Sequence, residues 1–412
     1  MTKISDLPRD LADEVLSRLP VTSLRAIRFT CKKWNTLTKR RSFTKKQIGW
    51  EQAEAKKKQE KELEAIMIMN DRVYLMSVNP DGIHKDDDNV ESSIKQKGKL
   101  ISLNGGDQVV ISQVYHCDGL LLCITNDNNN SRLVVWNPYF WQTRLIEPRE
   151  SYHKWDNYAL GYGIKKSSCN RSNIILRYLD AFEDMSEMSV EPPTRICQFE
   201  IYHFDSNSWM VIEDIPDWNI SHFSRGVSLK GMTYWFAQER ILPLEEEIEE
   251  IPGEIPELRE IPSFLLCFDF TTEKFGSLLP LPFQPRFNDT VTLSTIREEK
   301  LTVLYHRWDT AWTGIWISNK IEPNAVSWSS LFLPIGRIRP FEPISATFFV
   351  DEEKKLAVIF DKRKSIHNPT RNTAYIVGED GYCKQVDLGE SSVHSYCFPV
   401  LVCSYVPSCV QI

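Results

Sequence analysis

The sequence has no apolar run near the roughly 20 residues that a membrane-spanning helix needs. Its first ten residues, MTKISDLPRD, also lack the apolar stretch of a secretory leader. We therefore expect a protein of the cytoplasm and/or nucleus that has no membrane partner.

The sequence also has no excess of positive charge. It carries 49 Lys and Arg against 56 Asp and Glu, for a net charge of −7. Nucleic-acid binding needs a basic surface. A basic run is present at Lys39, Arg40, Arg41, Lys45 and Lys46. It offers no aromatic platform for base stacking and the rest of the chain is acidic, so we interpret it as the solvated face of a helix and expect no nucleic-acid partner.

Motifs of catalysis and metal binding are lacking as well. Cys117 and Cys123 do not have the C-x-x-C spacing of a zinc site. The glycines at 161–163 lack the lysine of a phosphate loop. His116, Cys117 and Asp118 adjoin one another, but Asp118-Gly119 is a hairpin signal, which favours a turn. We expect no catalytic residue, no metal and no cofactor.

Cysteines and tryptophans are present in number. The 10 cysteines lie mostly in apolar segments and are interpreted as core residues of a reducing compartment. Exposed tryptophans near turns can anchor a partner. Four tryptophans could either anchor a partner or pack in the core, and we favour core packing. They are Trp141, Trp155, Trp218 and Trp312.

Residues 5–37 have an apolar stripe at helical spacing. Leu11, Val15 and Leu19 recur every four residues, and a second stripe runs from Leu24 to Trp34 after the break at Pro20. A segment near 40 residues seldom buries a stable core alone. Its apolar face is covered either by another protein or by the rest of this chain, and the spacing leaves both open.

The same segment, LPRDLADEVLSRLPVTSLRAIRFTCKKWNTL, resembles the F-box over about 40 residues. The resemblance implies three helices that dock onto a Skp-type adaptor, which connects to cullin and RING subunits. Trp34 is either part of that adaptor face or an internal core residue. On the family pattern the candidates for the adaptor face are Leu7, Pro8, Leu11, Leu16, Pro20, Leu24, Ile27 and Cys31.

Residues 50–69, rich in Glu, Lys, Gln and Ala, predict a solvated helix between two domains. We place the domain boundaries at 1–45 for the helical domain, 46–69 for this linker and 70–412 for a second domain.

The second domain has period-two patterning, and turn residues recur about every ten positions. A degenerate repeat is visible at 133–138, 199–204 and 264–270, each preceded by two further strands. A unit of four strands in roughly 50–65 residues indicates a β-propeller. We predict about six blades, one of them closed by strands from both ends of the domain. A pair of β-sandwiches is the alternative.

Strings such as CDGLLLC, VVWNPYFWQTRLIEP, IYHFDSNSW and LLCFDFTTEKFG resemble the plant F-box-associated domain of type one. The resemblance implies a kelch-like propeller that binds a substrate protein. The acidic insert Glu239–Pro262 looks longer than the family pattern and is expected to form a surface loop.

The predicted fold class is therefore α+β and multidomain, with a small three-helix F-box followed by an all-β propeller. The predicted function is the non-catalytic substrate-recognition subunit of an SCF-type (Skp–cullin–F-box) ubiquitin ligase, whose protein substrate the sequence does not identify. An adaptor-bound module that does not direct degradation is the alternative, and a propeller enzyme is less favoured.

Overall fold

The structure is a computed structural model of the chain. The residues it describes are 8–19, 21–40, 42–44, 46–47, 49–50, 63–69, 72–78, 94–100, 110–127, 130–138, 142–153, 155–164, 171–182, 195–213, 216–220, 224–240, 261–286, 288–296, 299–310, 312–332, 347–363, 371–378, 382–390, 402–404, 410 and 412. Most of the acidic insert, 241–260, lies outside this set.

The first described elements are three helices, α1 (Arg9–Ser17), α2 (Val21–Thr30) and α3 (Lys32–Thr38). They enclose a small core of Ala12, Leu16, Leu24, Leu37 and Phe43. The buried Arg28 guanidinium of α2 donates to the hydroxyl and carbonyl of Thr38, which ties α2 to the end of α3. The predicted three-helix domain is confirmed. No helix in the described part of the chain is long and apolar enough to cross a bilayer.

Six antiparallel sheets follow, and we number them as blades. Blade 1 contains β26 (Val402–Ser404), β1 (Leu63–Met69), β2 (Arg72–Val78) and β3 (Ile94–Leu100). Blade 2 contains β4 (Val110–Cys117), β5 (Leu120–Asp127), β6 (Asn130–Asn137) and β7 (Gln142–Ile146). Blade 3 contains β8 (Asn157–Ile164), β9 (Arg171–Phe182), β10 (Arg195–His203) and β11 (Ser208–Ile212).

Blade 4 contains β12 (Trp218–Asn219), β13 (Val227–Leu229), β14 (Met232–Glu239), β15 (Ser263–Asp269), β16 (Lys274–Phe275) and β17 (Leu279–Pro280). The short β12 and β13 both pair with β14 and together take the place of a first strand, and β16 and β17 both pair with β15 and take the place of a fourth. Blade 5 contains β18 (Thr290–Ile296), β19 (Lys300–His306), β20 (Thr313–Glu322) and β21 (Ala325–Phe332). Blade 6 contains β22 (Thr347–Asp351), β23 (Leu356–Arg363), β24 (Arg371–Gly378) and β25 (Cys383–Glu390).

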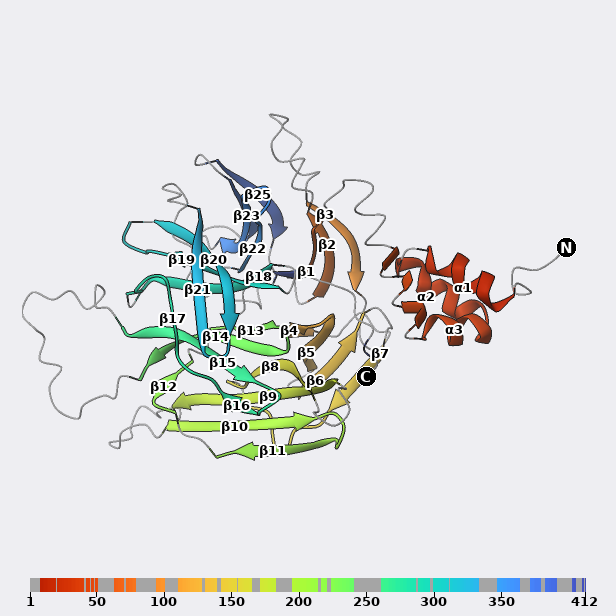
Figure 1. The fold of residues 1–412 in the computed structure, drawn as a ribbon, viewed down its shortest axis with the longest axis horizontal. Helices are drawn as coiled ribbons and strands as arrows, with labels where there is room; N and C mark the ends of the chain where they lie inside the picture. The colour runs from red at the N-terminus through yellow and green to blue at the C-terminus, as the bar shows by residue number, and fades with distance from the viewer. Residues whose placement is uncertain are drawn as a thin grey trace, which may run out of the picture.

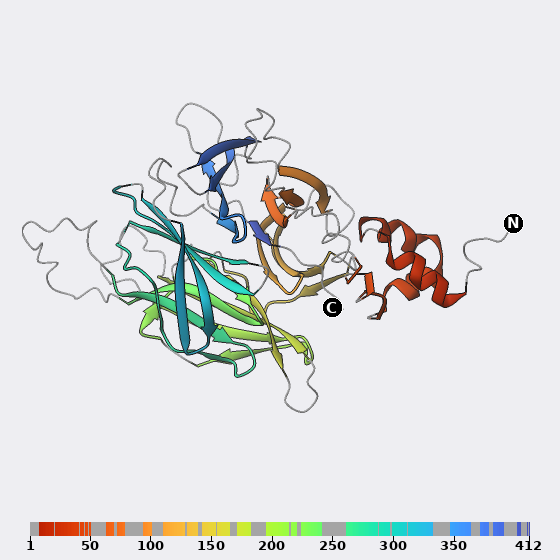
Figure 2. The same cartoon turned by 45° about the horizontal axis from the view of Figure 1, so that its top comes forward.

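The blades form a closed ring. The first strand of each blade lies near the first strand of the next, as β4 does with β8, β18 with β22 and β22 with β26. Figures 1 and 2 show the sheets arranged around this ring, with the helices as a separate body to one side. The propeller of about six blades is confirmed. Separate hydrophobic clusters lie between blades 2 and 3, 3 and 4, 4 and 5, 5 and 6, and 6 and 1, which excludes a pair of sandwiches.

The ring is closed by strands from both ends of the domain, as predicted. β26 pairs with β1, and β1 pairs with β2, so that the last strand of the chain becomes the first strand of blade 1. One prediction here is wrong. Residues 63–69, which we assigned to a helical linker, form β1. Ile66 and Met67 are fully buried in the sheet, and this burial overrides the local helix propensity.

Two-residue turns join the first and second strands in two of the blades. Asp118 and Gly119 have φ values of 48° and 73°, and Lys230 and Gly231 have 53° and 85°. Positive φ at both central residues is the geometry of a tight hairpin whose twist matches the strands. The Asp-Gly hairpin expected from the sequence is therefore confirmed.

The glycines at 161 and 163 let blades 3 and 4 approach closely. A Cβ on Gly161 would lie 2.1 Å from the Phe270 ring and 2.7 Å from the carbonyl oxygen of Gly231. The Gly231 oxygen also accepts a hydrogen bond from the Tyr162 backbone N–H at 3.3 Å. This close backbone contact explains the Gly-Tyr-Gly sequence that we had separated from phosphate loops.

The alternating strand directions give the ring two faces. The turn face carries the connections from first to second and from third to fourth strand, such as 118–119 and 270–273. The loop face carries the connections from second to third strand and from blade to blade, such as 307–312 and 147–156. β1 is the second strand of blade 1, so the chain coming from the helices enters the propeller at the turn face.

Candidate interaction surfaces

An apolar strip lies on the outer side of α1. Pro8, Leu11 and Val15 follow one another at spacings of three and four, which places them on one helix face. Leu11 is 54% exposed and Val15 is 50% exposed, and Pro8 is exposed as well. Among the described residues nothing covers this strip, although it lies next to the buried Ala12 and Leu16 on the same helix.

A second apolar side chain is exposed near the end of α2. Phe29 is 81% exposed, the highest value among the described large apolar residues. It lies off the Leu24–Ile27–Cys31 stripe, on the opposite side of α2. Val15 was counted in the predicted stripe but not among the adaptor-face residues, and Phe29 was missed. A Phe on the polar side of an amphipathic helix is the sequence signal for it.

The predicted adaptor-face residues divide into three groups. Pro8 and Leu11 are exposed, as a docking face requires. Leu16 is 3% exposed and Leu24 is 0% exposed, and both fill the internal core of the helices, so neither is presented at the surface. The partly buried residues of the predicted set are Ile27, Cys31 and Trp34, and the first and last of these pack against that core. Leu7 and Pro20 lie outside the described residues.

Charged side chains flank the apolar strip of α1. The Glu14 carboxylate accepts a hydrogen bond from Arg18 at 2.6 Å and pairs with Lys46. The Lys46 and Arg18 contacts lower the pKa of Glu14 from its ordinary value. The strip is thus apolar with a charged border, the composition of a surface that binds another protein.

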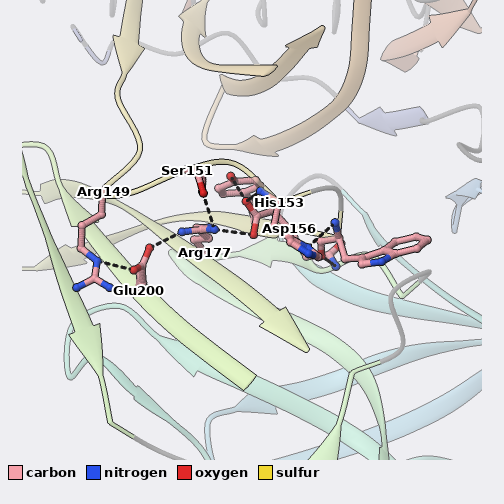
Figure 3. A network of polar contacts seen from close by, with 9 residues as sticks. Arg149, Ser151, His153, Asp156, Arg177 and Glu200 are labelled. Carbon is pink, nitrogen blue, oxygen red and sulfur yellow. Dashed lines mark hydrogen bonds and ion pairs between the residues drawn. The ribbon is translucent and has the colours of Figure 1, made fainter. Parts of the chain in front are cut away.

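A buried ionic cluster of the propeller lies in blade 3 (Figure 3). The Arg177 guanidinium lies between two carboxylates, 2.8 Å from Glu200 and 2.9 Å from Asp156. It also donates to the carbonyl oxygen of Ser151 at 3.1 Å. Arg149 donates to the other oxygen of Glu200 at 2.7 Å. These contacts attach the 147–156 connection to the sheet that follows it.

This cluster is ionic and almost closed to solvent. Arg177 is 7% exposed, Glu200 is 3% and Asp156 is 4%. Burial alone opposes the charge of Arg177, but the hydrogen bond and attraction of Asp156 outweigh it and raise the pKa of Arg177 above its ordinary value. Each charged side chain of the cluster is paired with another one. We therefore interpret the cluster as structural, because it attaches the connection between blades 2 and 3 to the sheet.

The His116–Cys117–Asp118 triplet takes part in a turn. The Gly119 backbone N–H donates to Nε2 of His116 at 3.2 Å, and Asp118 pairs with Arg171 at 2.8 Å. Burial lowers the pKa of His116 to about 4. Cys117, Cys123 and Cys267 are buried, as expected of core cysteines. Within the described ranges, no group of three or more His, Cys, Asp or Glu is arranged to hold a metal ion.

The four tryptophans near turns have different environments in the structure. Trp218 packs against the aromatic rings of Phe199 and Phe275. Trp155 is partly buried, and Trp141 lies outside the described residues. Trp312 lines a hollow on the loop face.

Two family profiles match the chain. Residues 4–46 match one described as "F-box domain", and residues 64–412 match one described as "F-box associated beta propeller domain". The second profile begins within β1, in agreement with the strand boundary in the structure.

Several proteins of Arabidopsis thaliana are similar along the whole chain. An F-box protein is 72% identical over 100% of both chains. An F-box/kelch-repeat protein is 53% identical over 100% of both chains. A further F-box protein is 49% identical over 100% of this chain and 99% of its own.

Proposed function

This chain belongs to the F-box proteins that carry an associated β-propeller domain, and from that premise we propose that it is the substrate-recognition subunit of an SCF-type ubiquitin ligase. In this proposal the helices dock onto a Skp-type adaptor, and through it onto cullin and RING subunits. The propeller holds the protein substrate. The observation that carries the proposal is the exposed apolar strip on a helical domain that stands apart from a closed propeller.

The adaptor contact is proposed to rest on Pro8, Leu11, Val15 and Phe29. Burying each large apolar side chain contributes roughly 1.5–3 kcal/mol. Association has its own cost in lost motion, so a contact of this kind needs several such residues together. Leu16, Leu24 and Trp34 support the docking face from within, because they hold α1, α2 and α3 in place.

The ligase activity requires no reacting group from this chain. A receptor that fixes a substrate near a charged ubiquitin-conjugating enzyme raises the effective concentration of the substrate lysine there. We propose that this chain works through proximity alone, in the cytoplasm and/or nucleus. A fluorescent fusion seen only in the secretory pathway or in mitochondria or chloroplasts would contradict that location.

The test is co-purification of the full chain with a Skp-type adaptor from Arabidopsis thaliana. Leu11→Asp and Phe29→Ser change exposed side chains, so each variant should melt within a few degrees of the wild type and still lose adaptor binding at least tenfold. Lys32→Ser, an exposed change on α3, is the matched control and should bind normally. Undiminished binding by both test variants would contradict the proposed face.

Ubiquitin transfer gives the second arm of the test. The reconstituted complex should modify proteins that co-purify with the propeller when the proteasome is inhibited in the source cells. Capture of the same proteins without any transfer would favour an adaptor-bound module that does not direct degradation.

A further inference from the structure

A hollow of about 430 Å³ opens on the loop face of blade 5, where β19 leads into β20. It is lined by Tyr305, Arg307, Thr310 and Trp312, and we name it the Tyr305 hollow. Its volume falls in the range of sites that hold one small ligand or one large side chain. β1, the first strand after the helices in the chain, starts at the opposite face, so a bound protein here would not compete with that end of β1 for space.

The aromatic walls of the Tyr305 hollow are fixed by other aromatic rings. Tyr305 stacks on Phe283 with ring centroids 4.2 Å apart and planes 6° apart. Trp312 lies 5.8 Å from Tyr305 and 5.8 Å from Trp316. Rings held from behind in this way lose little further motion when a ligand enters, which favours binding.

The connection that borders the hollow is fixed by two carboxylates. Asp309 accepts two hydrogen bonds from the Arg307 guanidinium, at 3.0 and 2.6 Å, and one from Arg286 at 2.9 Å. Asp289 accepts from the Tyr305 hydroxyl at 2.6 Å and from the backbone N–H groups of Arg286 and Trp308. The Arg307 N–H donates to the Trp312 carbonyl oxygen at 2.8 Å and closes the loop.

The charges at the Tyr305 hollow decide which occupant it favours. Two guanidinium groups and two carboxylates balance, so no net charge remains to attract an ion. A cation would meet Arg307 at the wall, and an anion would have to compete with Asp309 for that guanidinium. An uncharged apolar side chain can enter without breaking the ion pair between Arg307 and Asp309. It gains from burial against Tyr305 and Trp312.

Arg307 can orient a bound polypeptide through a hydrogen bond. In the part of the chain that the structure describes, its guanidinium donates only to Asp309 and uses two of its five N–H groups. The group is 30% exposed at the edge of the hollow. Its remaining N–H groups suit a backbone carbonyl of a polypeptide whose side chain fills the hollow. Tyr, Trp and Arg are also the residues that most often dominate protein contacts.

We infer that the Tyr305 hollow is a docking site for a partner polypeptide, which inserts one large uncharged apolar side chain and is held by a backbone hydrogen bond from Arg307. The inference rests on the proposed function, because it gives the propeller's substrate a place and a chemical class. The partner is recognised as an extended segment with an apolar anchor, not as a phosphorylated or basic one.

The experiment uses the full chain co-purified with its adaptor and a displayed library of random peptides. Thr310 is exposed at the hollow, so Thr310→Trp and Thr310→Arg fill it without opening the fold. Thr272 is also exposed but lies on the turn face, so Thr272→Trp and Thr272→Arg are matched controls. Each peptide selected on the wild type is then synthesised and its Kd is measured for all five proteins.

The selected peptides should share one Leu, Ile, Met, Phe or Trp at a fixed position. Their affinity should fall at least tenfold for both Thr310 variants and stay within twofold for both Thr272 variants. Equal binding to the Thr310 variants, a consensus defined by charge, or failure to select any peptide would overturn the inference. The amount of adaptor that co-purifies is measured in the same samples. Absence of the adaptor would contradict the proposed function, whereas unchanged peptide binding by the Thr310 variants would contradict only the docking site.

Discussion

Met67 of β1 and Val402 of β26 are antiparallel partners, so residues near the two ends of the propeller share one sheet. The same closure continues past β26. The Asn137 side chain donates to the Val410 carbonyl oxygen at 2.6 Å, and Ile412 packs with Val410 against the core between blades 2 and 3. The end of the chain therefore contacts blade 2 as well as its own blade.

Removal of residues 402–412 should destabilise the whole propeller. The deletion uncovers the β1 edge, with its buried Met67, and takes away the contacts of Val410 and Ile412. Losing several buried apolar contacts costs several kcal/mol out of a typical total of about 5–15 kcal/mol. We expect the truncated full chain to aggregate or to melt far below the wild type. A melting temperature within a few degrees of the wild type would show that closure by β26 is dispensable.

Gly161→Ala should destabilise the contact between blades 3 and 4. The new Cβ would overlap the Phe270 ring, whose backbone is fixed in the 270–273 turn, and it would press on the Gly231 carbonyl. Overpacking of this kind costs roughly 1–3 kcal/mol. Gly378→Ala is the matched control, because its Cβ would meet only Tyr382 at 3.7 Å. Urea unfolding should separate the two variants, and equal midpoints would contradict the close-approach argument.

Arg177→Ala should be much more damaging than the loss of an exposed arginine. It leaves the buried Asp156 and Glu200 without their shared cation, and breaking a buried ion pair costs roughly 3–5 kcal/mol. Arg371→Ala removes an ion pair with Asp387 whose side chains are 44% and 51% exposed. That loss should cost about 0–1 kcal/mol. Thermal unfolding of both variants tests the contrast, which fails if the two melt alike.

Stability should fall at acidic pH in part through His306. Burial lowers the pKa of His306 to about 4, although Asp289 opposes this shift. In the unfolded chain the pKa is about 6.5, so between these values only the unfolded state binds the proton. Stability is therefore full above about pH 6.5 and declines as the pH falls toward 4, by roughly 1–3 kcal/mol.

His306→Asn removes this titrating group and should flatten the decline. The measurement is the free energy of unfolding from urea titrations at pH 7, 5.5 and 4.5. As the pH falls, the free energy of unfolding of the wild type should decrease more than that of the variant. A difference that stays constant across that range would show that His306 does not carry the effect.

The sequence was sufficient for the architecture, because strand periodicity and turn residues are local signals. The repeat at 133–138, 199–204 and 264–270 falls on β6, β10 and β15, the third strands of three blades. β1 was missed because Glu64 and Ala65 favour a helix until β2 and β26 pair with the strand.

The interaction surfaces could be predicted only in part. The stripe of α1 and α2 indicates which side of each helix is apolar, but not which residues the helices bury among themselves. Leu24, which we expected on the adaptor face, is buried, and Phe29, which we did not expect there, is exposed. The Arg177 cluster and the Tyr305 hollow join segments far apart in the chain, such as Phe283 with Tyr305, and a single sequence carries no signal for such pairs.

The pairing of Met67 with Val402 also sets an order of events on the ribosome. At about 5–20 residues per second, β1 emerges on the order of half a minute before β26 is made. The helical domain precedes β1, so it can fold, and can bind the adaptor that we propose for it, while the ring is still open. During that interval the unpaired edge of β1 is a hazard for aggregation. We expect newly made chains to depend on chaperones until β26 is released.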